Sequence, residues 1–139
     1  METYFSTDKK LLEITKIHQY ISNESYWGKE RTLEEVQTTI DNSICFGMYT
    51  SSHQQIAFAR LVTDKAFFAY FMDVIVFPTY QGKGYGKALV QHMMEHEYTK
   101  NVHTLALKTK DAHGLYQQFG FKKIGNSPYW MSIDRLKLE

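Results

Sequence analysis

The sequence has little cysteine and little proline: Cys45 is its only cysteine, and two prolines occur among 139 residues. A lone cysteine cannot form an intramolecular disulfide, so we expect a protein of a reducing compartment, the cytoplasm. No stretch rich in Pro, Gly or Ser suggests a linker. We therefore expect a single domain that covers residues 1–139.

The sequence also lacks an excess of charge and a long hydrophobic run. Its formal net charge is +1, which argues against a nucleic-acid partner, since neutralising phosphates requires a basic surface. The longest apolar stretch, residues 66–77, contains Asp73 and is shorter than the roughly 20 residues of a transmembrane helix. The first residues resemble no signal peptide. We expect no membrane partner, and a monomer or a homodimer.

Aromatic residues, in contrast, make up 15% of the chain, and many fall in residues 67–77. The nearly continuous hydrophobicity of that segment predicts a strand buried on both faces. Strands are also predicted at residues 4–6, 44–50, 55–63, 104–108, 121–124 and 129–133. Helices are predicted from a cap at Thr7 or Asp8 to about residue 21, and at residues 33–41, 84–98 and 111–119. This order predicts an α/β chain with a mixed sheet.

A glycine-rich loop follows the long strand and leads directly into a helix. Gly82, Gly84 and Gly86 let the backbone turn tightly and approach a ligand closely. The start of the helix offers unpaired N–H groups and the positive end of the helix dipole, and Lys83 and Lys87 add full charges. The pattern favours a diphosphate site over a turn without a ligand.

Three other ligand patterns are weaker or incomplete. Lys87 is followed by alanine instead of Ser or Thr, so the Walker pattern of an ATP-dependent phosphotransferase is incomplete, and the glycine spacing does not fit the dinucleotide pattern GxGxxG. His92-Met-Met-Glu-His96 matches a zinc-peptidase pattern, H-x-x-E-H, but no third ligand is evident. We expect no metal.

Gln81-x-x-Gly84-x-Gly86 matches the Q/R-x-x-G-x-G/A signature of the GCN5-related N-acetyltransferase (GNAT) family. Val74-x-Val76-x-Pro78 resembles the strand that precedes this signature, and Ala112-His-Gly-Leu-Tyr116 with Phe119-Gly-Phe121 resembles a second family segment. The resemblance covers nearly the whole chain. It implies an α/β (α+β) fold: a mixed, strongly twisted sheet of six to seven strands, about four flanking helices, and a splay between the parallel strands 67–77 and 104–108.

The resemblance also implies a co-substrate, acetyl-CoA, and roles for particular residues. Val74 and Val76 would bind the pantetheine arm through their backbones, and Tyr116 resembles the general acid that protonates the departing thiolate. Thr109 stands where many members have asparagine beside the cofactor. The pyrophosphate would be bound by the segment Gln81, Gly82, Lys83, Gly84, Tyr85, Gly86 and Lys87. Transfer would be direct, within a ternary complex, and Cys45 is interpreted as a buried apolar residue.

Asp73 interrupts the apolar strand, and strand alternation places it on the face opposite Val74 and Val76. Unpartnered, such a carboxylate has a raised pKa and suits a general base that deprotonates the acceptor amine. The alternative is an ion pair with Arg60 on the neighbouring strand. Both interpretations remain open at this point.

Residues of the acceptor site are predicted less sharply. Tyr26 and Trp27 lie in the loop that borders the acceptor in the family, although packing onto the core is an equal alternative. His113 precedes Tyr116 by three residues and shares its helix face, although a local hydrogen bond is an alternative. No acidic cluster suggests a polyamine or a basic peptide. We therefore expect an N-acetyltransferase for a small primary amine; a protein amine and a non-catalytic acyl-CoA sensor are the alternatives.

Overall fold

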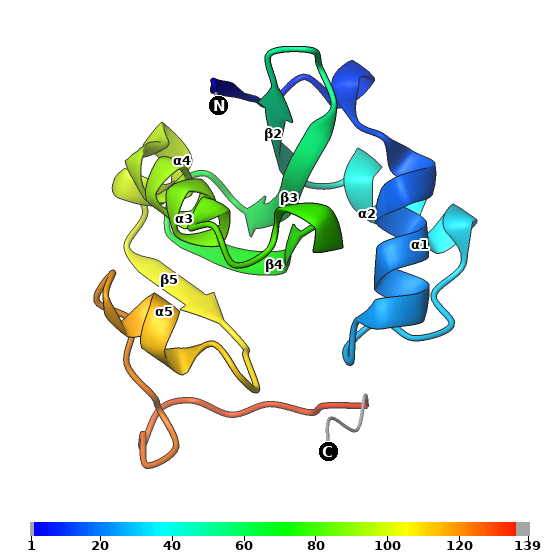
Figure 1. Cartoon of the computed structure of the whole chain (residues 1–139). Helices are drawn as coiled ribbons and strands as arrows, with labels where there is room; N and C mark the ends of the chain where they lie inside the picture. Colours follow the sequence, from blue (N-terminus) through cyan, green and yellow to red (C-terminus); the bar gives the residue numbers. More distant parts are fainter. Residues whose placement is uncertain (1, 136–139) are drawn as a thin grey trace.

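Five strands form one mixed sheet in the order of the chain, β1-β2-β3-β4-β5, in a computed structural model that describes residues 2–135. All neighbouring strands are antiparallel except β4 and β5, which are parallel. Five α-helices and two 3₁₀ helices flank the sheet (Figure 1). The strands are β1 (Thr3–Ser6), β2 (Ile44–Thr50), β3 (Gln55–Thr63), β4 (Phe68–Val76) and β5 (Thr104–Leu107). The helices are η1 (Lys9–Leu11), α1 (Ile14–Glu24), α2 (Leu33–Asp41), η2 (Pro78–Tyr80), α3 (Tyr85–Glu95), α4 (Glu97–Lys100) and α5 (His113–Gln117).

A separate hydrophobic core packs against each face of the sheet. Helices α1 and α2 cover one face, where Ile17, Ile21, Val36 and Ile40 pack against Phe58. Helices α3 and α5 cover the other face, where the buried side chains include Phe46, Leu61, Leu89, Met93 and Tyr116. The buried residues of α1 and α3 lie on one side of each helix, at the spacing expected of an amphipathic helix.

A β-bulge interrupts β4 at Asp73, whose φ of 50° is in the left-handed region. The register of β4 against β3 shifts here, because Phe58 pairs with Ile75 but Arg60 pairs with Met72. The extra residue interrupts the alternation of side chains between the two faces of the strand. Phe71 therefore belongs to the core under α3, whereas Ile75 belongs to the core under α1 and α2.

Strands β4 and β5 pair over a short stretch only, from Phe68 with Thr104 to Phe71 with Leu107. Beyond Phe71, residues 72–76 of β4 have no strand partner on the β5 side within residues 2–135. The two parallel strands separate here, as predicted, but β5 is the edge strand of the described sheet and not a central one. The separation leaves unpaired backbone groups along this part of β4.

The N-terminal half follows the predicted boundaries closely, with one exception. Thr32 and Glu35 form the capping box that begins α2, and the bounds of β2 and β3 are those predicted. The first predicted helix is divided: Asp8 caps η1, and α1 begins only at Ile14. Glu13 is kept out of the helix because its backbone N–H donates to the Gln55 side chain and its carboxylate accepts from the Gln55 N–H.

The C-terminal third differs more from the prediction. The predicted helix 84–98 breaks at His96, which is extended and accepts a hydrogen bond from Tyr98 N at its ring Nδ1. The strands predicted at residues 121–124 and 129–133 are wrong: neither segment is a strand, so the sheet has five strands instead of six to seven. High β-propensity does not make a strand without a paired edge. Tyr129, Met131 and Ile133 are accordingly 88%, 94% and 82% exposed.

Two contacts hold the C-terminal segment beside β5. The Trp130 ring lies 6.4 Å from the Phe68 ring, and Lys108 forms an ion pair with Asp134. Figure 1 shows this segment crossing beneath β5 and α5. None of the described helices has the length and apolar character needed to cross a bilayer.

Candidate active site

The glycine-rich loop joins β4, through η2, to the start of α3. Gly82 and Gly84 have φ values of 77° and 86°, and a Cβ atom at either position would meet no atom within 4 Å. Gly84 is the N-cap of α3 and no side chain caps this helix end. The N–H groups of the first helical turn therefore face outward without a side-chain acceptor. Lys83 and Lys87 are exposed at the same end of the helix.

Gln81 turns back from this loop over the end of β4. Its Nε2 donates to the carbonyl oxygen of Val76 at 2.9 Å and to the hydroxyl of Tyr20 at 3.4 Å. The side chain thus occupies one acceptor on the part of β4 that β5 leaves unpaired. Val74 and Val76 are partly buried, and both pack toward the core under α3.

A cavity of about 190 Å³ opens where β4 and β5 separate. The α1–α2 loop contributes Tyr26, Trp27 and Arg31 to its lining, and α5 contributes Tyr116. The remaining lining residues are Tyr70, Phe71, Met72, Asp73, Val74, Leu107, Lys108, Thr109, Asp111 and Ala112. Six of the residues singled out in the sequence therefore come together here: Tyr26, Trp27, Asp73, Val74, Thr109 and Tyr116.

Tyr116 also lines a second cavity of about 390 Å³, which His113 shares. The Tyr116 side chain is almost completely buried, and burial raises its pKa to about 12. Its hydroxyl is consequently protonated at any physiological pH and can donate a proton or a hydrogen bond. Tyr116 lies between the two cavities, while His113 lines only the larger one.

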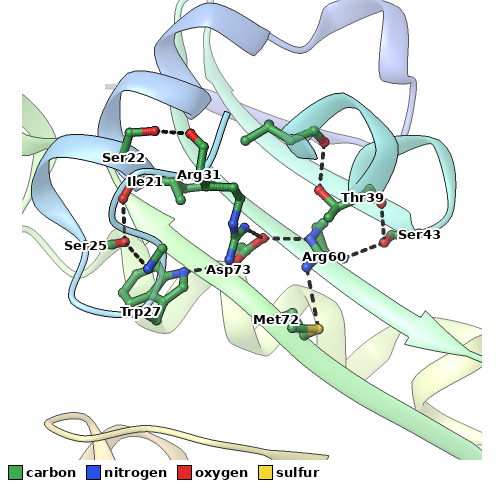
Figure 2. Close-up of polar contacts among 12 residues, drawn as sticks. Ile21, Ser22, Ser25, Trp27, Arg31, Thr39, Ser43, Arg60, Met72 and Asp73 are labelled. Atoms are coloured by element: carbon green, nitrogen blue, oxygen red, sulfur yellow. Dashed lines mark hydrogen bonds and ion pairs between the residues drawn. The ribbon is translucent and has the colours of Figure 1, made fainter. Parts of the chain in front are cut away.

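Asp73 accepts three hydrogen bonds from side chains (Figure 2). Trp27 Nε1 binds Oδ1, whereas Arg31 Nη1 and Arg60 Nε both bind Oδ2, each at 2.8 Å. Burial raises the pKa of Asp73, but the two guanidinium groups outweigh this effect and hold the pKa below its ordinary value. The ion pair with Arg60 that the sequence suggested is present. These contacts favour it over proton abstraction, because a stably ionised carboxylate with three donors is a weak base.

The two arginines are fixed by further contacts. Arg60 Nη1 donates to Ser43 Oγ at 2.8 Å, which ties the ion pair to the end of α2. The backbone oxygen of Arg31 accepts hydrogen bonds from the side chains of Ser22 and His18 on α1. Arg31 was not among the predicted site residues, because no sequence pattern connects residues that lie 42 positions apart in the chain.

Two loops meet across the mouth of the smaller cavity. The hydroxyl of Tyr26 accepts a hydrogen bond from Lys110 N at 2.7 Å, and the rings of Tyr26 and Trp27 are in edge contact at 5.2 Å. On the other loop, Thr109 Oγ1 accepts from Ala112 N. The α1–α2 loop and the β5–α5 loop are thus joined beside Tyr116.

The histidines of the H-x-x-E-H pattern pack against aromatic rings. His92 stacks on Phe5 at 4.1 Å, and His96 meets Phe46 edge-on at 5.2 Å. Within residues 2–135, no three His, Cys, Asp or Glu side chains are grouped so as to hold a metal ion. Aromatic packing accounts for the spacing of this pair.

Comparisons with known protein families and with solved structures point to the same family. A family described as "Acetyltransferase (GNAT) domain" matches residues 41–123, more than half of the chain. The crystal structure of a GNAT-family protein from Xanthomonas campestris pv. campestris has a TM-score of 0.90 and 40% sequence identity, and the match covers 96% of this chain and 94% of that one.

Curated relatives are longer than this chain. GCN5-related N-acetyltransferase 1, chloroplastic, from Arabidopsis thaliana is 31% identical, over 63% of this chain and 45% of its own length. A protein of Gibberella zeae, described as an acetyltransferase, is 27% identical, over 65% of this chain and 61% of its own. The matched region thus spans about half to three-fifths of these two relatives.

Proposed function

Because the chain belongs to the GNAT family of acetyltransferases, we propose that it transfers the acetyl group of acetyl-CoA directly to a primary amine of a small molecule. One observation carries the proposal: the buried hydroxyl-bearing side chain of Tyr116 lines a cavity at the point where β4 and β5 separate. A pure binding module needs no proton donor there.

The residues present fit acetyl-CoA. The unpaired backbone of β4 around Val74 and Val76 suits an extended amide chain that adds to the sheet edge. The open space at Gly82 and Gly84, together with the uncapped start of α3, suits a pyrophosphate. When bound, the thioester supplies an acetyl group activated for transfer to nitrogen.

Gln81 has to release the Val76 carbonyl if a ligand is to take that acceptor. Its amide is exposed and donates to two different oxygens, so exchange of one partner leaves no buried group unpaired. We propose that Gln81 covers the empty edge of β4 and moves aside when the pantetheine arm binds.

Tyr116 acts as the general acid in the proposed mechanism. The lone pair of the acceptor amine forms the new C–N bond, the C–S bond breaks with its electron pair on sulfur, and the Tyr116 hydroxyl gives its proton to that sulfur. Solvent restores the Tyr116 proton and takes the proton that the amine loses. Asp73 has no direct part in proton transfer, because its carboxylate is engaged by Trp27, Arg31 and Arg60.

Tyr26 and Trp27 form the wall of the acceptor site in this proposal. Both side chains are partly buried and line the cavity that Tyr116 reaches. Trp27 is held in place by its bond to Asp73, and Tyr26 by its bond to the β5–α5 loop. Aromatic walls held in this way exclude water from the amine while it reacts.

The test is to mix the purified protein with acetyl-CoA and a panel of small amines and to follow free thiol. We expect release that depends on the amine and on the protein, and a rise in melting temperature with CoA. Stabilisation by CoA without thiol release over the panel and over lysine peptides would favour an acyl-CoA sensor. Stabilisation by Mg-ATP in its place would favour phosphoryl transfer, and release with the peptides alone would favour a protein acceptor.

A further inference from the structure

Arg31 lines the smaller cavity and has guanidinium donors that Asp73 does not occupy. Nη1 is bound to Asp73, whereas Nε and Nη2 donate to no acceptor within residues 2–135. The side chain of Arg31 is 18% exposed and lines the cavity. A guanidinium has a planar set of five N–H donors suited to a carboxylate. Arg31 can therefore bind a second anionic group while it holds Asp73.

The cluster around Arg31 carries more positive than negative charge. Arg31 and Arg60 share a single carboxylate, Asp73, whose side chain is only 1% exposed. The side chain of Arg60 is 5% exposed, and that of Arg31 is 18% exposed. Because little water surrounds these groups, the interactions between their charges are strong. The excess positive charge attracts an anionic group of a molecule in the cavity. It repels any ammonium group that such a molecule carries in addition to the reacting amine.

The rest of the cavity narrows the kind of molecule that fits. Trp27 and Tyr26 offer aromatic surface beside Arg31, and Tyr116 reaches the cavity from a different element, α5. Lys108 is paired with Asp134, and Asp111 adds one exposed carboxylate to the lining. A volume of about 190 Å³ admits a molecule the size of a small amino acid.

We propose that the acceptor is a small primary amine that also carries a carboxylate, and that Arg31 binds this carboxylate. This inference rests on the proposed function and names its substrate class. With the carboxylate on the α1–α2 loop, the amine end of the molecule lies toward α5 and Tyr116. Arg31 is then a specificity-determining residue, and Asp73 is a positioning residue that fixes its guanidinium.

The kinetic test compares aminocarboxylic acids with their carboxamides of equal length. We expect the wild-type protein to prefer the acids at least tenfold in kcat/KM, and Arg31→Gln to abolish the preference by lowering the value for the acids alone. Arg31→Lys retains the charge without the planar donors and should retain part of the preference. Lys29→Gln removes an exposed charge from the same loop and should change nothing.

A binding test works without acetyl transfer. In a Trp130→Phe background, Trp27 is the only tryptophan, and its indole shares Asp73 with Arg31. We expect the aminocarboxylic acid to change its fluorescence saturably, Arg31→Lys to weaken this response several-fold, and the carboxamide to have little effect. Far-UV circular dichroism and the CoA melting shift verify that each variant is folded.

The two tests separate this inference from the proposed function. Thiol release with equal preference for acids and carboxamides, unchanged in Arg31→Lys, overturns the carboxylate site and leaves acetyl transfer standing. A saturable Trp27 response that depends on Arg31, without thiol release from any amine, supports the carboxylate site and rejects transfer. Absence of any Trp27 response to the acids overturns the inference whatever the activity.

Discussion

Nε of Arg60 lies 2.8 Å from Oδ2 of Asp73 and joins two neighbouring strands at the bulge of β4. The pair is buried, and the second arginine, Arg31, binds the same oxygen atom. An ion pair in this position fixes the α1–α2 loop, the bulge and the end of α2 relative to one another, because Arg60 also reaches Ser43.

Replacement of Asp73 by asparagine should destabilise the protein strongly. The change leaves the buried guanidinium group of Arg60 and the partly buried one of Arg31 without their counter-charge, which costs about 3 kcal/mol of unfolding free energy. Urea unfolding at pH 7 measures the loss. Asp134→Asn, which breaks the exposed pair with Lys108, is the matched control and should cost less than about 1 kcal/mol. Equal effects of the two variants would contradict a structural role for Asp73.

The same pair makes stability depend on pH in a predictable direction. The pKa of Asp73 is lower in the folded than in the unfolded chain, so its contribution is complete above the unfolded value of about 4 and is lost as the pH falls through the folded value. The stability difference between wild type and Asp73→Asn should be constant from pH 8 to 6 and should shrink as the pH falls below about 4. Unfolding curves across this range provide the measurement; a difference that grows in acid would reverse the assignment.

Tyr116→Phe should lower kcat by at least about tenfold and leave CoA affinity nearly unchanged. Burial raises the pKa of Tyr116 to about 12, so its hydroxyl remains protonated between pH 6 and 10 and the ratio of the two rates should not vary over this range. Thiol release measured at several pH values, with an isothermal CoA titration, tests both statements. Tyr129→Phe, in the exposed C-terminal segment, serves as control. An unaltered kcat in Tyr116→Phe would contradict the role of Tyr116 as general acid.

Gly84→Ala should reduce both stability and CoA affinity. A Cβ atom there meets nothing, so the cost is that of a φ of 86° in a residue with a side chain, about 1–2 kcal/mol. A loop that relaxes to avoid this strain no longer presents the same N–H groups to a pyrophosphate. Gly114→Ala, equally open but on α5 and without positive φ, should leave CoA affinity unchanged. Equal CoA affinities of the two variants would show that CoA binding does not require the positive φ of Gly84.

Cys45 should be dispensable for activity. Burial raises the pKa of its thiol to about 11, and thiolate is scarce at neutral pH. Alkylation by iodoacetamide should be slow in the native protein and fast in urea, and Cys45→Ala should retain kcat and lose about 1 kcal/mol of stability. An acetyl group found on Cys45 by mass spectrometry, with loss of activity in the alanine variant, would contradict direct transfer.

The parts of the fold that local sequence decides were predictable. The capping box of Thr32 and Glu35 sets the start of α2, and the polar turn at residues 51–54 separates the largely apolar strands β2 and β3. The start of α1 was not predictable, because the exchange of hydrogen bonds between Glu13 and Gln55 spans 42 residues. The strands predicted at residues 121–124 and 129–133 are wrong for a similar reason. A strand needs a neighbouring strand to pair with, and β-propensity does not say whether one is in reach.

Some residues of the candidate site were likewise predictable from the sequence, and others were not. Tyr26, Trp27 and Tyr116 were found from motifs and loop position, and they line one cavity. Strand alternation also placed Asp73 on the correct face, with Ile75 and opposite Val74. Strand alternation alone could not reveal the bulge. It therefore could not show that Phe71 and Ile75 belong to different cores. Arg31 was missed because its partner is defined only by the folded arrangement.

The extra residue in β4 introduces a charged group without changing which core the neighbouring side chains enter. Deletion of Asp73 would restore a regular strand and leave Phe71 and Ile75 in their separate cores, because the two residues would then lie an odd number of positions apart. What would be lost is the carboxylate that accepts hydrogen bonds from Trp27, Arg31 and Arg60. Related sequences that lack this extra residue should therefore keep both cores but lose the counter-charge of the two arginines.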